Sequence, residues 1–413
     1  HPIVRRVWGE SIHLFPILTM KKFIYNLLIY SPILIIIVVV NYFIDPAHRY
    51  ARKNYVSVIV KMLDQGHVTN VDDNYDARRF QISLIEHRAK TSIDILVLGS
   101  SRTMLISEKL FPGKTCLNLS VSGAGMNDEG ALYQACLRNQ IEIKRVILLV
   151  DPDFFNETNS GFSGKALEHD YQEYLRAIDK MKDSKKQSTH QDNSVSILKE
   201  IECIYSELGR KTNILSLSYF QKAIRYLLIK KKHSLCNTEH FDNPGNTIHT
   251  DGSWSYNEVF RNQPQKEIDR LGMHYHYKGW DHYHSLSPQK IEDLEQLVNY
   301  IRRNGSEVLI FNSSYHPYTY KRLITLREYR SMKTAMDFIS EFASTHQLQV
   351  IGSFDPAKSN CDKTYFYDAH HMNASGIEKI ISSFTEKTDS VMNRNIGRTE
   401  VGLEIHSTSN SRQ

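Results

Sequence analysis

The sequence predicts an α/β fold: a three-layer, doubly wound parallel sheet with a largely helical insertion and an N-terminal transmembrane helix. Short apolar runs of strand length alternate with amphipathic segments of helix length, which is typical of a parallel sheet covered on both faces. An uncharged stretch near the N-terminus has the length of a membrane span and predicts the transmembrane helix. With 413 residues, the chain is long enough to bury a large core.

The first half of the predicted core domain covers residues 91–156. Apolar runs predict strands at residues 94–98, 115–119 and 146–150. A helix is expected at residues 129–139, between the second and third of these strands. Each of these segments can therefore contribute to one α/β core.

The second half covers residues 291–390. Its first helix, residues 291–303, places apolar side chains on one face at helical spacing. The elements expected after it are a strand at 308–311, a helix at 326–345, a strand at 348–351 and a final helix at 374–388. Residues 391–413 are polar and predict a disordered tail.

Residues 157–290 interrupt this pattern and are expected to form an insertion that caps the active site. Residues 165–188 predict a charged helix, and a second helix carries an apolar stripe of Leu217, Phe220, Ile224, Leu227 and Leu228. The stripe favours packing against the parent domain. The basic residues 230–232 leave a helix on the membrane surface as the alternative.

Residues 23–44 carry no charge and predict a transmembrane anchor. A buried core helix is one alternative, but residues 33–40 are apolar on every face. A cleaved signal peptide is the other, but the run is long and no clear small-x-small cleavage site follows it. Residues 1–22 are expected to be a leader, with a natural start at Met20, and residues 45–90 a juxtamembrane linker.

Charged residues on the two sides of the span predict its orientation. Lys21 and Lys22 favour a cytoplasmic N-terminus, whereas Arg49, Arg52 and Lys53 argue for the reverse. We expect a single-pass protein of the inner (cytoplasmic) membrane, with its main domain extracytoplasmic, in the periplasm. The net charge of +5 is small for this length and predicts no nucleic-acid partner.

Three groups of residues raise the question of metal binding. The five cysteines match no zinc spacing, and Cys203 with Cys236 is the candidate disulfide if the compartment is oxidising. Residues 273–284 are rich in histidine and aromatic residues, which suits a metal site, a glycan-binding surface or a packed loop. Asp151 and Asp153 are cation ligands or turn residues. None of these completes a familiar ligand spacing, so we predict no metal and no cofactor.

The triplet Gly99–Ser101 is the most informative feature of the sequence. A serine after a buried parallel strand, on a tight turn that opens a helix, is where α/β folds expose a nucleophile. We expect Ser101 to be the nucleophile, His371 the general base and Asp368 the group that orients the base. The alternative is structural, with Ser101 as a helix cap and Asp368 and His371 as turn residues.

An oxyanion formed at this site needs positioned hydrogen-bond donors. We expect the backbone N–H groups of Ser101 and Gly123 to supply two of them. Asp153 falls near the place of a side-chain donor, where a carboxylate would repel an oxyanion, and Asn156 is expected to substitute. Arg102 is expected to hold an anionic group of the substrate or to form a surface ion pair.

These residues resemble the sequence blocks of the SGNH (GDSL-type) hydrolases. Gly99–Ser101 is similar to their Gly-Asp-Ser block, Asn118–Gly123 to their second block with its oxyanion glycine, and Asp368–His371 to their last block. The resemblance covers residues 92–156 and 290–388 as interrupted blocks and implies the flavodoxin-like SGNH fold.

The sequence departs from this family at two positions. Ser100 replaces the usual aspartate, and Asp153 stands near the place of the asparagine of the third block. Together with the anchor, the blocks are similar to membrane-anchored bacterial SGNH-like polysaccharide O-acetyltransferase and esterase proteins. That resemblance implies a serine O-acyl esterase or O-acyltransferase that acts on an acylated cell-surface polysaccharide, with a multispanning membrane acyltransferase as a candidate partner.

Two other classes of function remain as alternatives. The altered third block favours a catalytically inactive SGNH-like protein that binds a glycan or an acyltransferase partner. A flavodoxin-like nucleotide binder would need a glycine-rich phosphate loop, and the sequence contains none.

Overall fold

The computed structural model describes residues 14–44, 55–71, 76–158, 165–183, 215–229 and 245–386. The chain divides into two compact units. The first unit comprises His1–Tyr55, Asn74–Asp76 and Thr189–Ser234, and the second comprises Val56–Asp73, Ala77–Ser188 and Leu235–Gln413. The predictions for residues 1–13, for the Cys203–Cys236 pair, for residues 230–232 and for the tail at 391–413 lie outside the described residues.

The second unit is built on a five-stranded parallel sheet. Its strands are β2 (Ser92–Leu98), β3 (Cys116–Asn118), β4 (Glu142–Leu149), β7 (Glu307–Asn312) and β8 (Gln349–Gly352). They lie in the order β3-β2-β4-β7-β8, and every neighbouring pair is parallel. The predicted α/β fold with a parallel sheet is confirmed. The chain changes direction across the sheet between β2 and β4, which is where open parallel sheets place their ligand sites.

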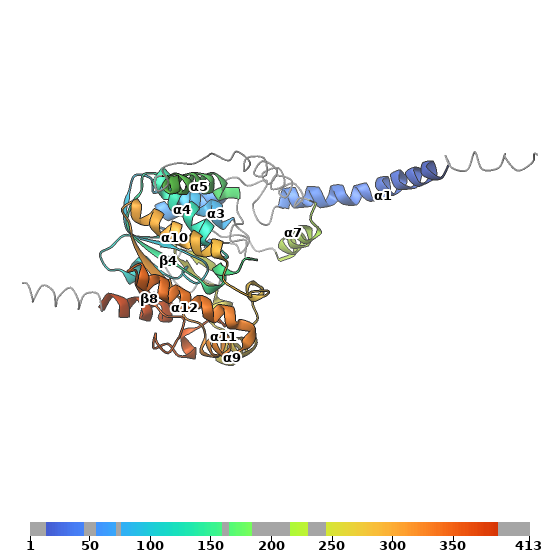
Figure 1. Cartoon of the computed structure of the whole chain (residues 1–413). Coiled ribbons are helices and arrows are strands. Elements are labelled where there is room, and N and C mark those ends of the chain that lie inside the picture. The colour runs from blue at the N-terminus through green and yellow to red at the C-terminus, as the bar shows by residue number, and fades with distance from the viewer. Residues whose placement is uncertain are drawn as a thin grey trace, which may run out of the picture. The chain divides into compact units, whose positions relative to one another are not determined.

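Helices pack against this sheet (Figure 1). α4 (Met126–Arg138), α10 (Pro288–Arg303) and α12 (Arg330–Thr345) each connect two parallel strands in the direction from β3 to β8, and right-handed crossovers place all three on one face. α3 (Ala77–His87) and α5 (Glu168–Asp183) pack against α4, and α9 (Gln265–His274) packs against α11 (Pro317–Thr325). Each helix buries one stripe of apolar side chains, as α12 does with Met332, Ala335 and Ile339.

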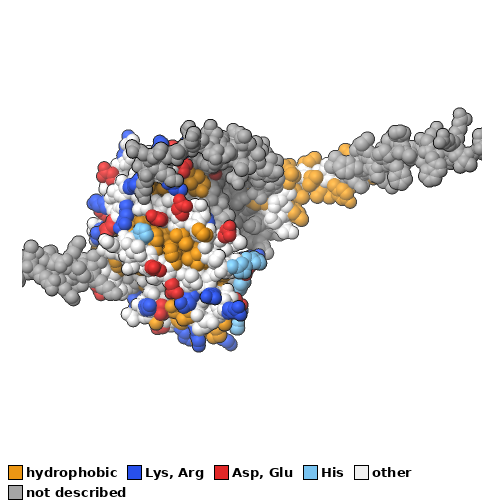
Figure 2. Space-filling view, viewed as in Figure 1, with side chains coloured by type: hydrophobic (Ala, Val, Ile, Leu, Met, Phe, Trp, Pro, Cys, Tyr) orange, Lys and Arg blue, Asp and Glu red, His pale blue; other side chains and the backbone are white. Residues whose placement is uncertain are grey.

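The core of the second unit lies between these layers. The strands are buried on both faces: Leu96, Val97 and Leu98 of β2 are completely inaccessible to solvent, as are residues 146–150. Such continuous apolar runs are what a doubly covered parallel strand requires. On the face shown in Figure 2, acidic and basic side chains are interspersed around apolar ones.

Most of the segment predicted as a linker, residues 45–90, belongs to the second unit, which includes Val56–Asp73 and begins again at Ala77. α2 (Tyr55–Asp64) and α3 bury apolar side chains at helical spacing, among them Ile59, Leu63, Phe80 and Leu84. Charged residues on the exposed faces of these helices lower the mean hydropathy of the segment. Composition therefore indicated a linker where the spacing of the apolar residues forms two packed helices.

A second, three-stranded sheet was not predicted. It consists of β1 (Thr69–Val71), β5 (Asn246–Ile248) and β6 (Trp254–Ser255) in the order β1-β5-β6, paired antiparallel. Strands of two or three residues carry no period that a sequence can reveal. The described part of the insertion therefore contains two short strands, β5 and β6, in addition to helices.

The helix predicted at residues 326–345 begins later than expected. Its first residues form a 3-10 turn at Arg327–Tyr329, and α12 begins at Arg330. α11 ends at Thr325, just before the predicted range. The other short helices are η1 (Glu108–Leu110), η2 (Pro152–Phe155), η3 (Lys165–Leu167), α8 (Glu258–Arg261), η4 (Lys278–Trp280) and η6 (Lys363–Tyr365). The last described helix covers residues 374–386.

The first unit contains α1 (Leu14–Ile44), which includes the predicted span, and α7 (Leu217–Ile229) packed against it. The Asn41 side-chain amide donates a hydrogen bond to the Ser216 carbonyl at 3.1 Å. Among the described residues, no helix combines the length and the apolar character that crossing a membrane requires. Membrane attachment stays a prediction.

Gly99 lies where β2 closely approaches β4. A Cβ at this position would lie 2.6 Å from Leu149 Cβ. This atom is bonded directly to the backbone of β4, so a change of side-chain rotamer cannot relieve the contact. Glycine therefore permits the close contact of the two strands, and this contact fixes where the turn after β2 begins.

Replacing Gly99 with alanine should lower the free energy of unfolding by about 1–3 kcal/mol, because the added methyl overpacks the contact between β2 and β4. Urea denaturation followed by circular dichroism measures the change. Ser122→Ala, at an exposed position after β3, is the control and should change the free energy by less than about 0.5 kcal/mol. Equal stability of the two variants would contradict the packing argument.

Candidate active site

The turn after β2 positions Ser101. Residues 101–105 form turns, and Thr103 donates both its N–H and its hydroxyl to the Ser100 carbonyl, at 3.1 and 3.0 Å. Asn118, at the end of β3, donates its side-chain amide to the Thr103 carbonyl at 2.9 Å. The helix expected to open here does not form, because these hydrogen bonds hold the backbone in turns. The alternative role of Ser101 as a helix cap is thereby removed.

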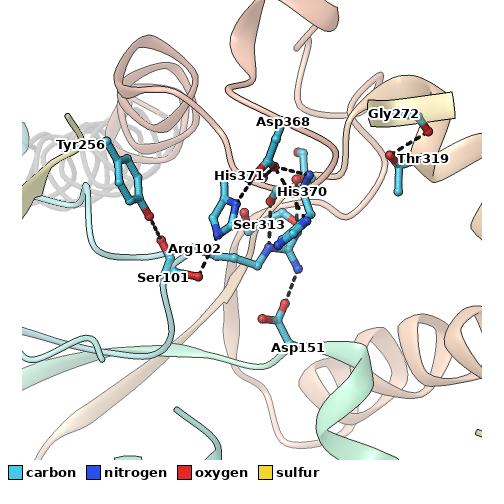
Figure 3. A network of polar contacts seen from close by, with 11 residues as sticks. Ser101, Arg102, Asp151, Tyr256, Gly272, Ser313, Thr319, Asp368, His370 and His371 are labelled. Carbon is cyan, nitrogen blue, oxygen red and sulfur yellow. Dashed lines mark hydrogen bonds and ion pairs between the residues drawn. The ribbon is translucent and has the colours of Figure 1, made fainter. Parts of the chain in front are cut away.

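Ser101, His371 and Asp368 form a continuous hydrogen-bonded chain (Figure 3). Ser101 Oγ lies 2.8 Å from His371 Nε2, and His371 Nδ1 lies 2.7 Å from Asp368 Oδ2. Asp368 Oδ1 accepts the backbone N–H groups of His370 and His371, each at 2.8 Å. The carboxylate therefore holds both the imidazole ring and the backbone of the loop that carries it. The structure brings together residues that lie up to 270 positions apart in the sequence.

The charges at this site favour an ionised Asp368. Burial acts to raise the pKa of its carboxyl, but the charge and hydrogen bond of His371 and the contacts of His370 outweigh burial and lower the pKa below 3.8. An ionised Asp368 keeps the Nδ1 of His371 protonated and leaves Nε2 as an acceptor for the Ser101 hydroxyl proton. Burial, with the charges of His371 and Arg102, lowers the pKa of His370 to about 3, so His370 is neutral at physiological pH.

Arg102, expected to bind a substrate anion or to form a surface ion pair, is a buried residue of the domain core. Its side chain is 4 % exposed and pairs with Asp151 at the end of β4. Its guanidinium also donates to the Ser313 carbonyl at 2.6 Å and to the His370 carbonyl at 3.2 Å. The Tyr315 ring stacks against it, 4.1 Å from guanidinium carbon to ring centroid. The expected ion pair is therefore present, but it is buried instead of lying at the surface, and protein acceptors bind the guanidinium.

Two of the residues expected to supply oxyanion donors, Asn156 and Gly123, differ in their surroundings. Asn156 is 1 % exposed, and its side-chain amide donates to the carbonyls of Gly279 and Asp281 at 2.9 and 3.1 Å. This commitment corrects the expectation that Asn156 faces an oxyanion. Gly123 lies in an exposed turn with φ of +68°, a left-handed conformation that favours glycine, and open space lies where its Cβ would be.

Aromatic rings flank the two adjacent histidines. The rings of Tyr256 and Phe260 each lie 6.1 Å from the His371 ring, between centroids. The Tyr275 ring lies 5.0 Å from the His370 ring. All three aromatic residues belong to the insertion, so the insertion contributes directly to the surroundings of the candidate base.

Sequence analysis did not include Tyr256 or Ser313 among the site residues. The Tyr256 hydroxyl donates to the Ser101 carbonyl at 2.9 Å (Figure 3), and no local pattern predicts this contact. Ser313 follows the apolar strand β7 directly, as Ser101 nearly follows β2. Polar residues after each of two parallel strands lie at one edge of the sheet, and that signal could have placed Ser313 at the site.

The histidine-rich segment 273–284 forms contacts within the protein. The His276 ring lies 2.6 Å from the Asp281 carboxylate, and the Tyr283 hydroxyl donates to the Pro152 carbonyl at 2.9 Å. Within the described ranges, two groups bring three candidate metal ligands within 4.8 Å of one another: Asp368, His370 and His371, and His169, Asp170 and Glu173. The first group is the hydrogen-bonded cluster already described.

A family model described as "Protein of unknown function (DUF1574)" matches residues 68–386. No protein with a curated description matches the chain. A solved structure from Streptococcus pneumonia, provisionally described as a platelet activating factor, is similar at 10% identity over 80% of this chain and 97% of its own, with a TM-score of 0.33. A similarity at that level supports no statement about function.

Asp153 lies in η2, close to Asp151. Burial, and then the charge of Asp151, raises the pKa of Asp153 from 3.8 to about 7. A carboxyl whose pKa rises on folding weakens the fold once it ionises. The loss of folding stability caused by Asp153 is absent below about pH 4, grows between pH 4 and about 7, and is constant above about pH 7.

Asp153→Asn should therefore raise the free energy of unfolding by roughly 1–3 kcal/mol near pH 8 and change it little near pH 4. Urea denaturation at the two pH values measures the difference. Glu157→Gln, at an exposed position four residues along the chain, is the control and should have the same small effect at both. A gain for Asp153→Asn that does not depend on pH would contradict the account.

Proposed function

We propose that this chain, which belongs to the DUF1574 family, is a serine O-acyl esterase or O-acyltransferase. The observation that carries the proposal is the unbroken hydrogen-bonded chain from Ser101 Oγ through His371 to Asp368. A hydroxyl is a weak nucleophile at neutral pH and needs a base, which in turn needs a group to orient it. The three side chains meet both needs at the carboxyl edge of the parallel sheet.

In the proposed mechanism, Ser101 Oγ attacks the acyl carbonyl carbon while its proton passes to His371 Nε2. Asp368 stabilises the imidazolium that forms. The bond between the acyl carbon and the leaving alcohol then breaks, and His371 returns the proton to the leaving oxygen. The acyl group remains on Oγ as an ester.

The second half of the reaction removes that ester. The oxygen of water or of a sugar hydroxyl attacks the acyl carbon while His371 takes its proton. His371 then returns the proton to Ser101 Oγ as the ester bond to Oγ breaks. Water as the acceptor gives hydrolysis, and a sugar hydroxyl gives acyl transfer. The same base serves both halves.

The oxyanion in this mechanism is held by backbone donors. We assign the Ser101 N–H and the Gly123 N–H to this role, because Gly123 lies in an exposed turn that leaves space beside it. Below about pH 7, Asp153 is mostly neutral and lacks the negative charge that would oppose an oxyanion.

We also place the chain with the SGNH-like hydrolases and their three-layer, doubly wound fold. The strand order β3-β2-β4-β7-β8 supports this placement, since it is the order of flavodoxin-like sheets. Ser101 follows β2, which comes first of these strands along the chain, and Asp368 and His371 precede the last helix, as the sequence blocks of that family lead one to expect.

The proposed substrate is an acylated cell-surface polysaccharide. Tyr256, Phe260 and Tyr275 support a sugar substrate, because aromatic faces beside the histidines can pack against sugar rings. Attachment to the inner membrane through residues 23–44, a periplasmic main domain and a multispanning acyltransferase partner are further parts of the proposal. These parts rest on the sequence alone.

A catalytically inactive protein of the same fold, which binds a glycan or an acyltransferase, is the second candidate. The commitment of the Asn156 amide to Gly279 and Asp281 favours it. A donor that the third block supplies in the resembling family is then missing from the oxyanion site.

Wild-type protein should react with a fluorophosphonate probe at Ser101, because the probe captures only an activated serine. Ser101→Ala should abolish the reaction, and His371→Ala should slow it by at least about 100-fold, the usual contribution of a general base. Mass spectrometry of the labelled peptide locates the adduct.

Ser122→Ala removes an exposed serine outside the hydrogen-bonded chain and should react at the wild-type rate. Absence of labelling in the wild-type protein would support the inactive, binding candidate. Labelling that survives in Ser101→Ala would place the nucleophile elsewhere and end the proposal.

Phe260→Ala should raise the KM for an O-acetylated polysaccharide by about 2–10-fold and leave the KM for p-nitrophenyl acetate unchanged, because a stacked ring contributes about 0.5–1.5 kcal/mol. Acetate release measures both. Val259→Ala, at the adjacent and largely exposed position, is the control. The same rise in KM for both substrates would argue against a sugar subsite at Phe260.

A further inference from the structure

We infer that Arg102 is a positioning residue, which sets the orientation of His371 toward Ser101 through the backbone of His370. The inference rests on the proposed serine chemistry and deepens it. It assigns Arg102 a role that differs from substrate binding and from general stabilisation of the fold.

Two hydrogen bonds at adjacent positions join the turn after β2 to the loop that carries His370 and His371. Ser101 Oγ bonds to His371 Nε2 at 2.8 Å, and Arg102 Nε donates to the His370 carbonyl at 3.2 Å (Figure 3). Arg102 follows Ser101 in the chain, and His370 precedes His371. The peptide group that leads into His371 is therefore held by the neighbour of the nucleophile, and a shift of that peptide group would turn the imidazole away from Ser101.

The guanidinium that makes this contact is itself fixed by the sheet. It pairs with Asp151 after β4 and donates to the Ser313 carbonyl after β7 at 2.6 Å. The Tyr315 ring covers its face at 4.1 Å. Because these contacts come from the ends of two parallel strands, they fix the position of the guanidinium relative to the sheet. The guanidinium in turn fixes the position of the histidine loop.

The geometry needs the arginine side chain in particular. The planar guanidinium reaches Asp151 with one nitrogen and the His370 carbonyl with another. A lysine would keep the charge beside Asp151 but, as a single point of contact, would not hold both acceptors. Arg102→Lys is therefore the variant that separates positioning from charge.

Arg102→Lys should slow the labelling of Ser101 by a fluorophosphonate by about 10–100-fold, since a misplacement of about 1 Å at a catalytic group costs up to 100-fold. The KM for p-nitrophenyl acetate should stay within about 2-fold, because Arg102 contacts no substrate. Arg145→Lys is the matched control: Arg145 pairs with Glu307 across β4 and β7 at 2.6 Å, in an exposed position. Its labelling rate should equal that of the wild type.

Proton NMR provides a readout that does not depend on activity. The wild-type protein should show a low-field signal from the hydrogen bond between His371 Nδ1 and Asp368, and Asp368→Asn should lack it. Arg102→Lys should shift or broaden this signal, whereas Arg145→Lys should leave it unchanged. If the wild type is not labelled and the signal still responds to Arg102→Lys, the proposed chemistry fails while the positioning role stands.

Thermal melting establishes that each variant is folded. If Arg102→Lys does not fold, Tyr315→Leu takes its place, since it removes the ring that covers the guanidinium, and it should slow labelling several-fold with an unchanged KM. A raised KM with an unchanged kcat would show that Arg102 binds substrate and would overturn the inference. A wild-type labelling rate together with an unchanged low-field signal would overturn it as well.

Discussion

A buried ion pair between Arg102 and Asp151 is the constraint on which the site depends. Charges inside a protein are costly unless they are paired and hydrogen-bonded, and removing one partner of such a pair typically costs about 3–5 kcal/mol. Here the pair is almost inaccessible to solvent, and the carbonyls of Ser313 and His370 accept from the same guanidinium. The turn after β2, the ends of β4 and β7, and the histidine loop consequently share one low-energy arrangement.

Two different residues join the chain segments of the site and orient its histidine. The Arg102 cluster fixes where the chain segments meet, whereas Asp368 fixes the ring of His371 and the backbone beside it. The electrostatics follow this division, since Asp368 is ionised and the adjacent His370 is neutral at physiological pH. The candidate base thus has one negatively charged neighbour and no second imidazolium beside it.

Much of this arrangement could be predicted from local patterns. Continuous apolar runs revealed β2 and β4, and the position of Ser101 beyond a strand end together with the spacing of Asp368 and His371 indicated the hydrogen-bonded chain. The burial of Arg102 could not be predicted, because the local sequence Ser-Arg-Thr is typical of an exposed turn and its partner, Asp151, lies 49 positions away. Asn156 likewise bonds to a loop more than 100 positions along the chain. Contacts of this range depend on the assembled sheet, which the local sequence does not encode.

The central claim is that Ser101 carries the acyl group during turnover. Acid quenching during reaction with p-nitrophenyl acetate, followed by mass spectrometry of the peptides, tests it most directly. The account predicts the added mass of one acetyl group on the peptide that contains Ser101, and its absence in Ser101→Ala. Turnover of the ester with no adduct at Ser101, or with an adduct on another residue, would contradict it.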